Sequence, residues 1–210
     1  WSASTAKSSR SWTVPQGPDA IVVTGAGGFL GRETARQAIA SGSVVRALAR
    51  RLPDEPLPLT YETVDLFDAS ALKRAFSGAS AVVHAAGRAH LFRGESEPGQ
   101  LERDNVHLTA AVVRAAKEAG VRTVVLASSI SVYAPLPASV RGSDPRERDE
   151  SAPLGPASAY AASKLEAERR ALTEKDGHPR ETGFVCETPA GPIKQEPADA
   201  RQRADEPHRE

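Results

Sequence analysis

The feature that most constrains the fold is a short apolar segment followed at once by a glycine-rich turn. Residues 21–23 read Ile-Val-Val, a continuous apolar run typical of a strand that is buried on both faces of a parallel sheet. Residues 24–31 read Thr-Gly-Ala-Gly-Gly-Phe-Leu-Gly, and a helical pattern over about 30–41 follows. A strand, a glycine turn and a helix in this order predict the start of a β-α-β unit.

The alternation of strands and helices continues along the chain. Further strands are predicted at 44–49, 81–83 and 123–127, and further helices at 71–76, 102–119 and 157–172. Gly42 and Gly120 follow two of these helices at the position where glycine commonly ends a helix. The long helix carries one apolar stripe, made of Val106, Ala110, Val113 and Ala116. The pattern predicts an α/β fold, a Rossmann-like doubly wound parallel sheet with helices on both faces.

Composition divides the chain into three parts. Residues 1–18 are rich in Ser and Thr, contain no acidic residue, and are expected to form a disordered leader. Residues 175–210 are crowded with Pro, Glu, Asp and Arg, and such a composition buries too little apolar surface to offset the entropy of ordering. The predicted dinucleotide-binding domain therefore spans 19–174, and the tail is expected to be mostly disordered.

The charge balance and the apolar runs exclude several classes of partner. Lys+Arg and Asp+Glu both number 27, so no excess charge favours nucleic acid or an anionic membrane as partner. No apolar run approaches the roughly 20 residues of a membrane helix. Cys186 is the single cysteine, so no intrachain disulfide can form, and a cytoplasmic location is expected.

The glycine turn predicts a binding site for a dinucleotide cofactor. Gly25 permits the tight turn, Gly28 lets the backbone approach the pyrophosphate, and Gly31 lets the helix pack close to the strand. The N–H groups and the positive dipole end of the helix then face the phosphates. Phe29 and Leu30, inside the turn, belong to the same predicted cofactor site. A purely structural glycine turn is the weaker interpretation.

The end of the second strand bears on the choice of cofactor. An acidic side chain there would bind the ribose hydroxyls of NAD, but this chain has Ala49 followed by Arg50 and Arg51. A guanidinium suits a 2′-phosphate better than a hydroxyl, so NADP is favoured over NAD, with Arg50 as its ligand. The alternative is that these arginines are simply solvated.

A serine, a tyrosine and a lysine form the predicted catalytic group. Tyr160 and Lys164 lie four residues apart in one predicted helix and so share a face. A phenol is a poor base at neutral pH, but a nearby ammonium stabilises the phenolate. Ser129 follows the last predicted strand, beyond whose carboxyl end ligands bind in such sheets. Tyr160 is expected to exchange a proton with a substrate hydroxyl, and Ser129 to hold the substrate oxygen.

Together these segments resemble the extended branch of the short-chain dehydrogenase/reductase family over roughly residues 20–172. The resembling segments are Thr24 to Gly31, Val64-Asp65-Leu66, Val83 to Gly87, Asp104-Asn105-Val106 with Thr109, Ser128 to Tyr133, and Tyr160 to Lys164. The resemblance implies that Asp65 and Leu66 contact adenine and that Ala85, Ala86 and Gly87 pass under the nicotinamide ribose. It also implies that Asn105 approaches the cofactor. His84 is expected to be a packed histidine rather than an acid or base.

Within that family the detail is closest to nucleotide-sugar epimerases and dehydratases, which implies a small-molecule nucleotide-sugar as substrate. Family members usually continue with further strands and a substrate domain, whose expected Arg-Pro loop is absent here. We therefore expect the C-terminal strands and substrate domain to be incomplete, through truncation or a frameshift. An NADPH-dependent reductase of a small carbonyl compound and a dinucleotide-binding module without turnover stay open as alternatives. The resemblance also implies a possible homodimer.

Overall fold

A computed structural model describes residues 19–53, 57–59, 61–88, 99–135 and 152–175. The leader and tail predicted at 1–18 and 175–210 lie outside these ranges, except for Lys175 at the end of the last described helix. Everything below concerns the described part of the chain.

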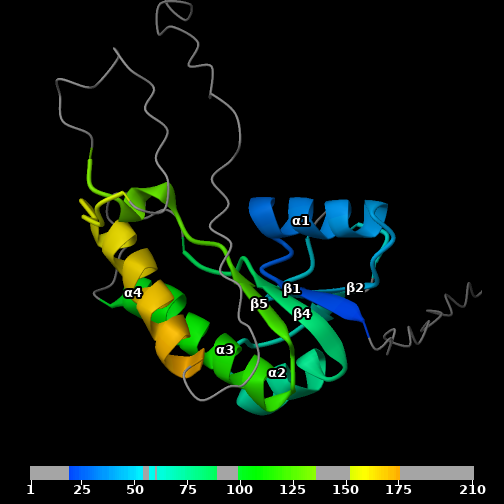
Figure 1. Ribbon diagram of the computed structural model, residues 1–210. Helices are drawn as coiled ribbons and strands as arrows, with labels where there is room; N and C mark the ends of the chain where they lie inside the picture. The colour runs from blue at the N-terminus through cyan, green and yellow to red at the C-terminus, as the bar shows by residue number, and fades with distance from the viewer. Residues whose placement is uncertain (1–18, 54–56, 60, 89–98, 136–151, 176–210) are drawn as a thin grey trace, which may run out of the picture.

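Five parallel strands form one sheet in the order β3-β2-β1-β4-β5 (Figure 1). They are β1 (Ala20–Thr24), β2 (Val45–Ala49), β3 (Tyr61–Thr63), β4 (Ala79–His84) and β5 (Thr123–Leu126). In the register of the central strands, Val22 of β1 lies opposite Arg46 of β2 and Val82 of β4. The chain adds β2 and β3 on one side of β1, and then crosses back to add β4 and β5 on the other side of β1. The topological switch point, where ligands bind in sheets of this kind, is therefore at the carboxyl ends of β1 and β4.

Helices cover both faces of the sheet, as the sequence predicts. They are α1 (Phe29–Ala40), α2 (Ala69–Phe76), the π-helical η1 (Glu102–His107) continuing into α3 (Leu108–Glu118), the 3₁₀ turn η2 (Ile130–Val132) and α4 (Ala159–Lys175). Figure 1 shows α1 on one face and α2 and α3 on the opposite face. Helix α4 packs on η1 and α3 and also contacts η2. The Rossmann-like doubly wound prediction is thus confirmed.

Two apolar cores fix these layers to the sheet. The larger one joins the sheet to α2 and α3 and includes Val22, Val82, Leu72, Phe76 and Val112. The smaller one lies under α1 and includes Val23, Val45, Ala47 and Ala35. Because Val22 and Val23 face opposite cores, the continuous apolar run of β1 is explained by burial on both sides.

Two helices begin where a side chain caps them rather than where the apolar pattern starts. The Asp68 carboxylate accepts a hydrogen bond from Ala71 N at 3.0 Å, so α2 begins at Ala69 rather than at 71. The Ser158 hydroxyl accepts one from Ala161 N at 3.1 Å, so α4 begins at Ala159 rather than at 157. The catalytic pair predicted at 160 and 164 therefore lies in the first two turns of α4.

Two elements differ more substantially from the sequence predictions. Strand β3 was not predicted, because its three residues are only half-buried or exposed and form no apolar run. The single helix predicted at 102–119 begins instead as the π-helical η1. Short π-helical stretches inside helices are frequent at functional sites.

An arginine is buried in the middle of β2. Arg46 is 1% exposed, and its guanidinium donates to the carbonyls of Ala75 at 2.7 Å and Ser77 at 2.9 Å. These carbonyls lie at the C-terminus of α2, where intrahelical partners are lacking. Burial lowers the pKa of Arg46, opposed by the charge of Glu62. Arg46 thus fastens α2 to the strand that leads to Arg50.

Candidate active site

The turn after β1 has room for glycine only at two of its predicted positions. Gly25 has a φ of +71°, and a Cβ there would lie 2.6 Å from Ala86 N. A Cβ on Gly31 would lie 2.3 Å from Gly25 O. Both contacts are with backbone, which cannot move aside like a flexible side chain. The turn is therefore packed between β4 and α1 as tightly as the sequence predicts.

The N-terminus of α1 is not capped by a side chain. Gly28 is the N-cap residue with extended backbone, its N–H donates to Gly25 O at 2.9 Å, and the first turn carries no acidic residue. Phe29 is 94% exposed and Leu30 43% exposed. N–H groups at the start of this helix are thus available to an anion, together with the positive end of its dipole. The arrangement fits a cofactor pyrophosphate.

The end of β2 lies beside this turn, and β3 is the next strand of the sheet. A Cβ built on Gly27 would lie 3.6 Å from the Ala49 side chain, so β2 ends against the turn and Arg50 follows it, exposed. After β3, the exposed Asp65 accepts a hydrogen bond from Phe67 N at 3.0 Å. Leu66 is half-buried and packs against the larger core. The adenine contacts predicted for Asp65 and Leu66 stay predictions.

The segment after β4 lies directly over the glycine turn. Ala85 N donates to Thr24 O at 3.2 Å, and Ala86 N donates to Thr24 Oγ1 at 3.4 Å. Ala85 and Ala86 are half-buried and Gly87 is exposed. These three residues therefore lie at the switch point, where the sequence predicts the nicotinamide ribose.

His84 is a packed histidine, as expected. It is 1% exposed, its Nδ1 is hydrogen-bonded to Thr24 Oγ1 at 2.7 Å, and its Nε2 to Thr109 Oγ1 at 3.2 Å. Burial and, to a smaller extent, the charge of Lys164 together lower the pKa of His84 to about 3. The imidazole is therefore neutral at physiological pH, and it joins β1, β4 and α3.

Asn105 of η1 joins the segment after β4 to α4. Its Oδ1 accepts from Arg88 N at 2.8 Å, and its Nδ2 donates to Arg88 O at 3.1 Å and to Ser163 Oγ at 2.9 Å. Asp104 adds an ion pair, 2.7 Å from Arg88 Nη2. The Asn105 side chain is buried, and both hydrogens of its amide are used by protein partners. The predicted contact of Asn105 with the cofactor stays a prediction.

Helix α4 carries two of the three predicted catalytic residues to the end of β5. Lys164 is 8% exposed and its Nζ donates to Ala127 O, while Tyr160 is half-buried one turn earlier. Ser129 begins η2, and its Oγ accepts from Ser131 N at 3.2 Å. Because α4 contacts η2, the fold brings the tyrosine and lysine helix against the serine turn. Their catalytic roles stay predictions.

Glu168 is a residue of this region that the sequence reasoning missed. Its carboxylate accepts a hydrogen bond from Ser128 Oγ. The available signal was its spacing, because residues 160, 164 and 168 recur every four positions on one helix face. The Ser128 partner, 40 residues away in sequence, carried no such signal.

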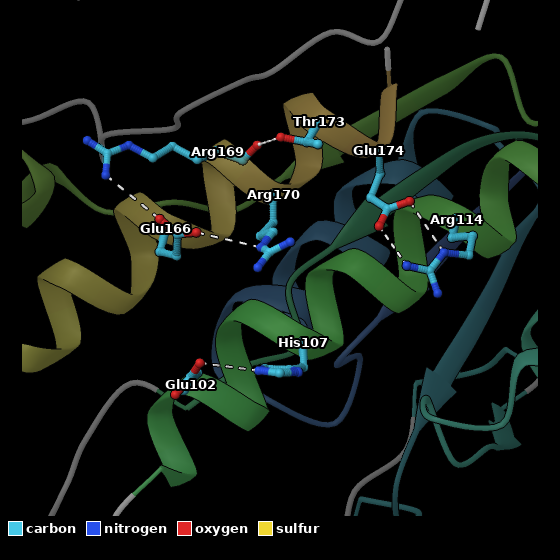
Figure 2. A network of polar contacts seen from close by, with 8 residues as sticks. All are labelled: Glu102, His107, Arg114, Glu166, Arg169, Arg170, Thr173 and Glu174. Carbon is cyan, nitrogen blue, oxygen red and sulfur yellow. Dashed lines mark hydrogen bonds and ion pairs between the residues drawn. The ribbon is translucent and has the colours of Figure 1, made fainter. Parts of the chain in front are cut away.

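A second set of polar contacts lies on the α3–α4 surface (Figure 2). Arg114 of α3 pairs with Glu174 of α4 at 2.6 Å, and Glu166 lies 3.7 Å from Arg169 and 3.6 Å from Arg170. Arg114 is exposed and Glu166 is half-buried. Hydrogen bonding to Arg114 lowers the pKa of Glu174. The Arg114–Glu174 pair joins α3 to α4, whereas the Glu166 pairs lie within α4, and none of them uses a predicted catalytic residue.

Two features are absent from the described part of the chain. None of its helices combines the length and the apolarity that crossing a membrane requires. Among its histidine, cysteine and acidic side chains, no group of three or more could hold a metal ion.

Comparisons with known proteins agree with this geometry. A model of the NAD dependent epimerase/dehydratase family matches residues 21–204. A dTDP-glucose 4,6-dehydratase of Streptomyces antibioticus is 31% identical over 173 residues, covering 75% of this chain and 49% of that protein. A 2-alkyl-3-oxoalkanoate reductase of Shewanella oneidensis is 31% identical over 172 residues, covering 80% and 42%.

Among solved structures, MoeE5 in complex with UDP-glucose and NAD is 30% identical with a TM-score of 0.65. The match covers 79% of this chain and 52% of that one. The chain thus spans about half the length of the relatives it matches. The match over most of the chain, together with the glycine turn at the switch point, shows that this chain belongs to the NAD dependent epimerase/dehydratase family.

Proposed function

We propose that the chain is the cofactor-binding and acid–base part of an NAD(P)-dependent epimerase or dehydratase acting on a nucleotide-linked sugar. The observation that carries the proposal is the uncapped N-terminus of α1, set at the switch point of the sheet, with α4 packed against the serine turn. A sugar substrate is supported by the dehydratase relative and by the UDP-glucose bound in the structural neighbour.

In this proposal three side chains handle the substrate. The Ser129 hydroxyl binds the oxygen of the reacting sugar carbon and orients it. Tyr160 accepts the hydroxyl proton at its phenolate oxygen, and the Lys164 ammonium stabilises that phenolate. The nicotinamide, when bound, supplies the acceptance and return of hydride.

The test is turnover. The protein, and its Tyr160→Phe variant as matched control, are incubated with UDP- and dTDP-glucose and either dinucleotide, and the sugars are separated by chromatography. We expect a changed sugar with the wild type only. Cofactor binding without any sugar conversion would favour a dinucleotide-binding module, and no binding of either dinucleotide would overturn the proposal.

For the cofactor we propose that NADP binds through Arg50. The support is the absence of a carboxylate at residues 49–51, where β2 ends against the turn, and the exposure of Arg50. The structural neighbour is a complex with NAD, so both dinucleotides belong in the experiment. In calorimetric titration, Arg50→Ala should weaken NADP about tenfold and leave NAD unchanged. Equal affinities of the wild type for the two cofactors would contradict the assignment.

A second candidate function is one-way reduction of a small carbonyl compound. It is favoured by the similarity to the 2-alkyl-3-oxoalkanoate reductase and by Arg50, since a dissociable NADPH suits net reduction. The two functions differ in stoichiometry. A reductase consumes one NADPH per product, whereas an epimerase or dehydratase regenerates its cofactor in each turnover.

We further propose that the α3–α4 surface pairs with a second copy. A shallow groove of about 240 Å³ runs along it, lined by Val106, Ala110, Ala111, Arg114 and Arg170 among others. The surface carries both arginine and glutamate side chains, so opposite charges of two copies can meet across a two-fold axis. Light scattering of the protein and its Ala110→Arg variant tests this: a wild-type dimer that the variant converts to monomer is expected.

A further inference from the structure

Two hydrogen bonds from α4 hold consecutive residues at the end of β5. Lys164 Nζ donates to the carbonyl of Ala127, and the Glu168 carboxylate accepts from the hydroxyl of Ser128. The two side chains come from successive turns of the helix, so they act on the strand end as a pair of adjacent tethers. The next residue of the chain is Ser129.

The tethers act where the chain leaves the sheet. Ala127 N still donates to His84 O at 3.1 Å, which extends the β4–β5 pairing by one residue. Ser129 is the N-cap of η2, because its carbonyl accepts from Val132 N at 3.1 Å and its hydroxyl from Ser131 N at 3.2 Å. Ser128 is therefore the link between a rigid strand and the turn that carries the serine.

Glu168 differs from the other glutamates of α4 in what it contacts. It is half-buried on the side of the helix that also carries Lys164, next to Ala167, which is fully buried. Glu166, two residues earlier, is also half-buried, but its ion pairs are with Arg169 and Arg170 of its own helix. A carboxylate that accepts a hydrogen bond from a hydroxyl group in a half-buried place makes a strong, directional bond.

We propose that Glu168 is a positioning residue, which through Ser128 sets the Ser129 turn against the Tyr160–Lys164 face of α4. It touches neither substrate nor cofactor in this role. The assignment rests on the proposed function, since the position of Ser129 relative to Tyr160 matters only if both residues act on the same substrate oxygen.

Kinetics on the nucleotide-sugar found to be turned over form the first test. Glu168→Ala should lower kcat about tenfold and leave KM within about twofold, because outer hydrogen-bond partners orient catalytic groups without binding substrate. Glu168→Gln keeps an acceptor oxygen and should restore most of the rate. Ser128→Ala should match Glu168→Ala, and the double variant should lose no more than either alone.

Glu166→Ala is the matched control and should leave kcat unchanged. Additive losses in the double variant, a rise of KM alone, or no rescue by Glu168→Gln would overturn the assignment.

A second measurement is independent of turnover and separates this inference from the proposed function. Hydrogen exchange in the full chain should be about tenfold faster at the amides of Ser131 and Val132 in Glu168→Ala, and unchanged there in Glu166→Ala. Amides of β1 and β4 should keep their protection, which verifies folding. If exchange changes as expected but no sugar is converted, the proposed function fails and the positioning stands. Unchanged exchange at Ser131 and Val132 in Glu168→Ala and Ser128→Ala would overturn the positioning itself.

Discussion

The glycine turn and helix α4 lie at the same carboxyl edge of the sheet but use their polar groups in opposite ways. At the turn, the N-terminus of α1 has no side-chain cap, so its first N–H groups are available to a ligand. In α4, the polar side chains of Ser163, Lys164 and Glu168 are bonded to other parts of the protein. The first region leaves backbone groups unpaired for the proposed cofactor, and the second is held in place by hydrogen bonds of its side chains. Substitutions should therefore act differently in the two regions.

The largest effect is expected at the turn. Gly31→Ala places a Cβ 2.3 Å from Gly25 O, and the backbone must move. We expect dinucleotide affinity to fall at least about 100-fold and the free energy of unfolding to fall by about 3 kcal/mol. Gly42→Ala is the control: its φ is +82° but nothing lies within 4 Å, so about 1 kcal/mol is lost and affinity is kept. Calorimetry and urea unfolding measure both, and equal affinities of the two variants would refute the shape argument.

A smaller loss of stability is expected from removing the hydrogen bonds by which Asn105 joins the segment after β4 to α4. Asn105→Ala leaves Arg88 N and Ser163 Oγ without their amide partner and should lower the free energy of unfolding by about 2 kcal/mol. Ser163→Ala removes one of the three bonds of that amide and should cost about 1 kcal/mol. Urea unfolding of both variants orders them. If Asn105→Ala weakened dinucleotide binding without destabilising the fold, Asn105 would belong with the turn instead.

The buried histidine gives the next prediction, a dependence of stability on pH. The pKa of His84 is lowered from 6.5 to about 3 by burial and by Lys164, so below pH 6.5 the unfolded chain takes up a proton that the native protein does not. The stabilisation that this group contributes is fully present above pH 6.5 and declines as the pH falls. Well inside the range between the two pKa values, the decline is about 1.4 kcal/mol per pH unit. Between pH 6 and 5 we expect a loss of about 1 kcal/mol.

In His84→Asn, the free energy of unfolding should fall less as the pH is lowered, because the buried imidazole is gone. In His107→Asn, which replaces an exposed histidine, it should fall as in the wild type. An identical pH dependence of wild type and His84→Asn would show that the imidazole is not held neutral.

The smallest effect on stability is expected for the ion pairs of the α3–α4 surface. Glu174→Gln removes the pair with the exposed Arg114, and solvent screening limits the loss to about 0.5 kcal/mol. The loss should shrink further in 1 M salt. Thermal unfolding at two salt concentrations checks this, and a loss as large as that of Asn105→Ala would erase the distinction between tether and surface pair.

The regions predicted well from sequence are those built from local pattern. The apolar run of β1, the glycine spacing and the start of α1 follow one another directly, and each is required by contacts within or next to the segment. Gly25 and Gly31 could be predicted because their steric needs arise from one turn. The same holds for the positive-φ residues Gly42 and Gly120 at helix ends.

The features that were missed depend on partners distant in sequence. Arg46 looks like a polar residue for the solvent side of a strand, and only the carbonyls of α2, 29 residues on, explain its burial. Glu168 meets Ser128 from 40 residues away. Strand β3 exists because β2 offers it an edge, not because its own residues are apolar. Long-range pairing leaves no periodic trace in the sequence.

The strand order also has a consequence for how the chain folds during synthesis. β1 can pair with β2 as soon as α1 connects them, but its other neighbour, β4, meets it through Thr24 and His84, 60 residues apart. Until β4 leaves the ribosome, one edge of the apolar strand β1 is open to other chains. Closing the long loop between β1 and β4 is slow, so the central β1–β4 pairing of the sheet forms late in translation. Misfolding of this protein should therefore begin at β1, and variants that slow the β1–β4 pairing should lower its yield before they lower its stability.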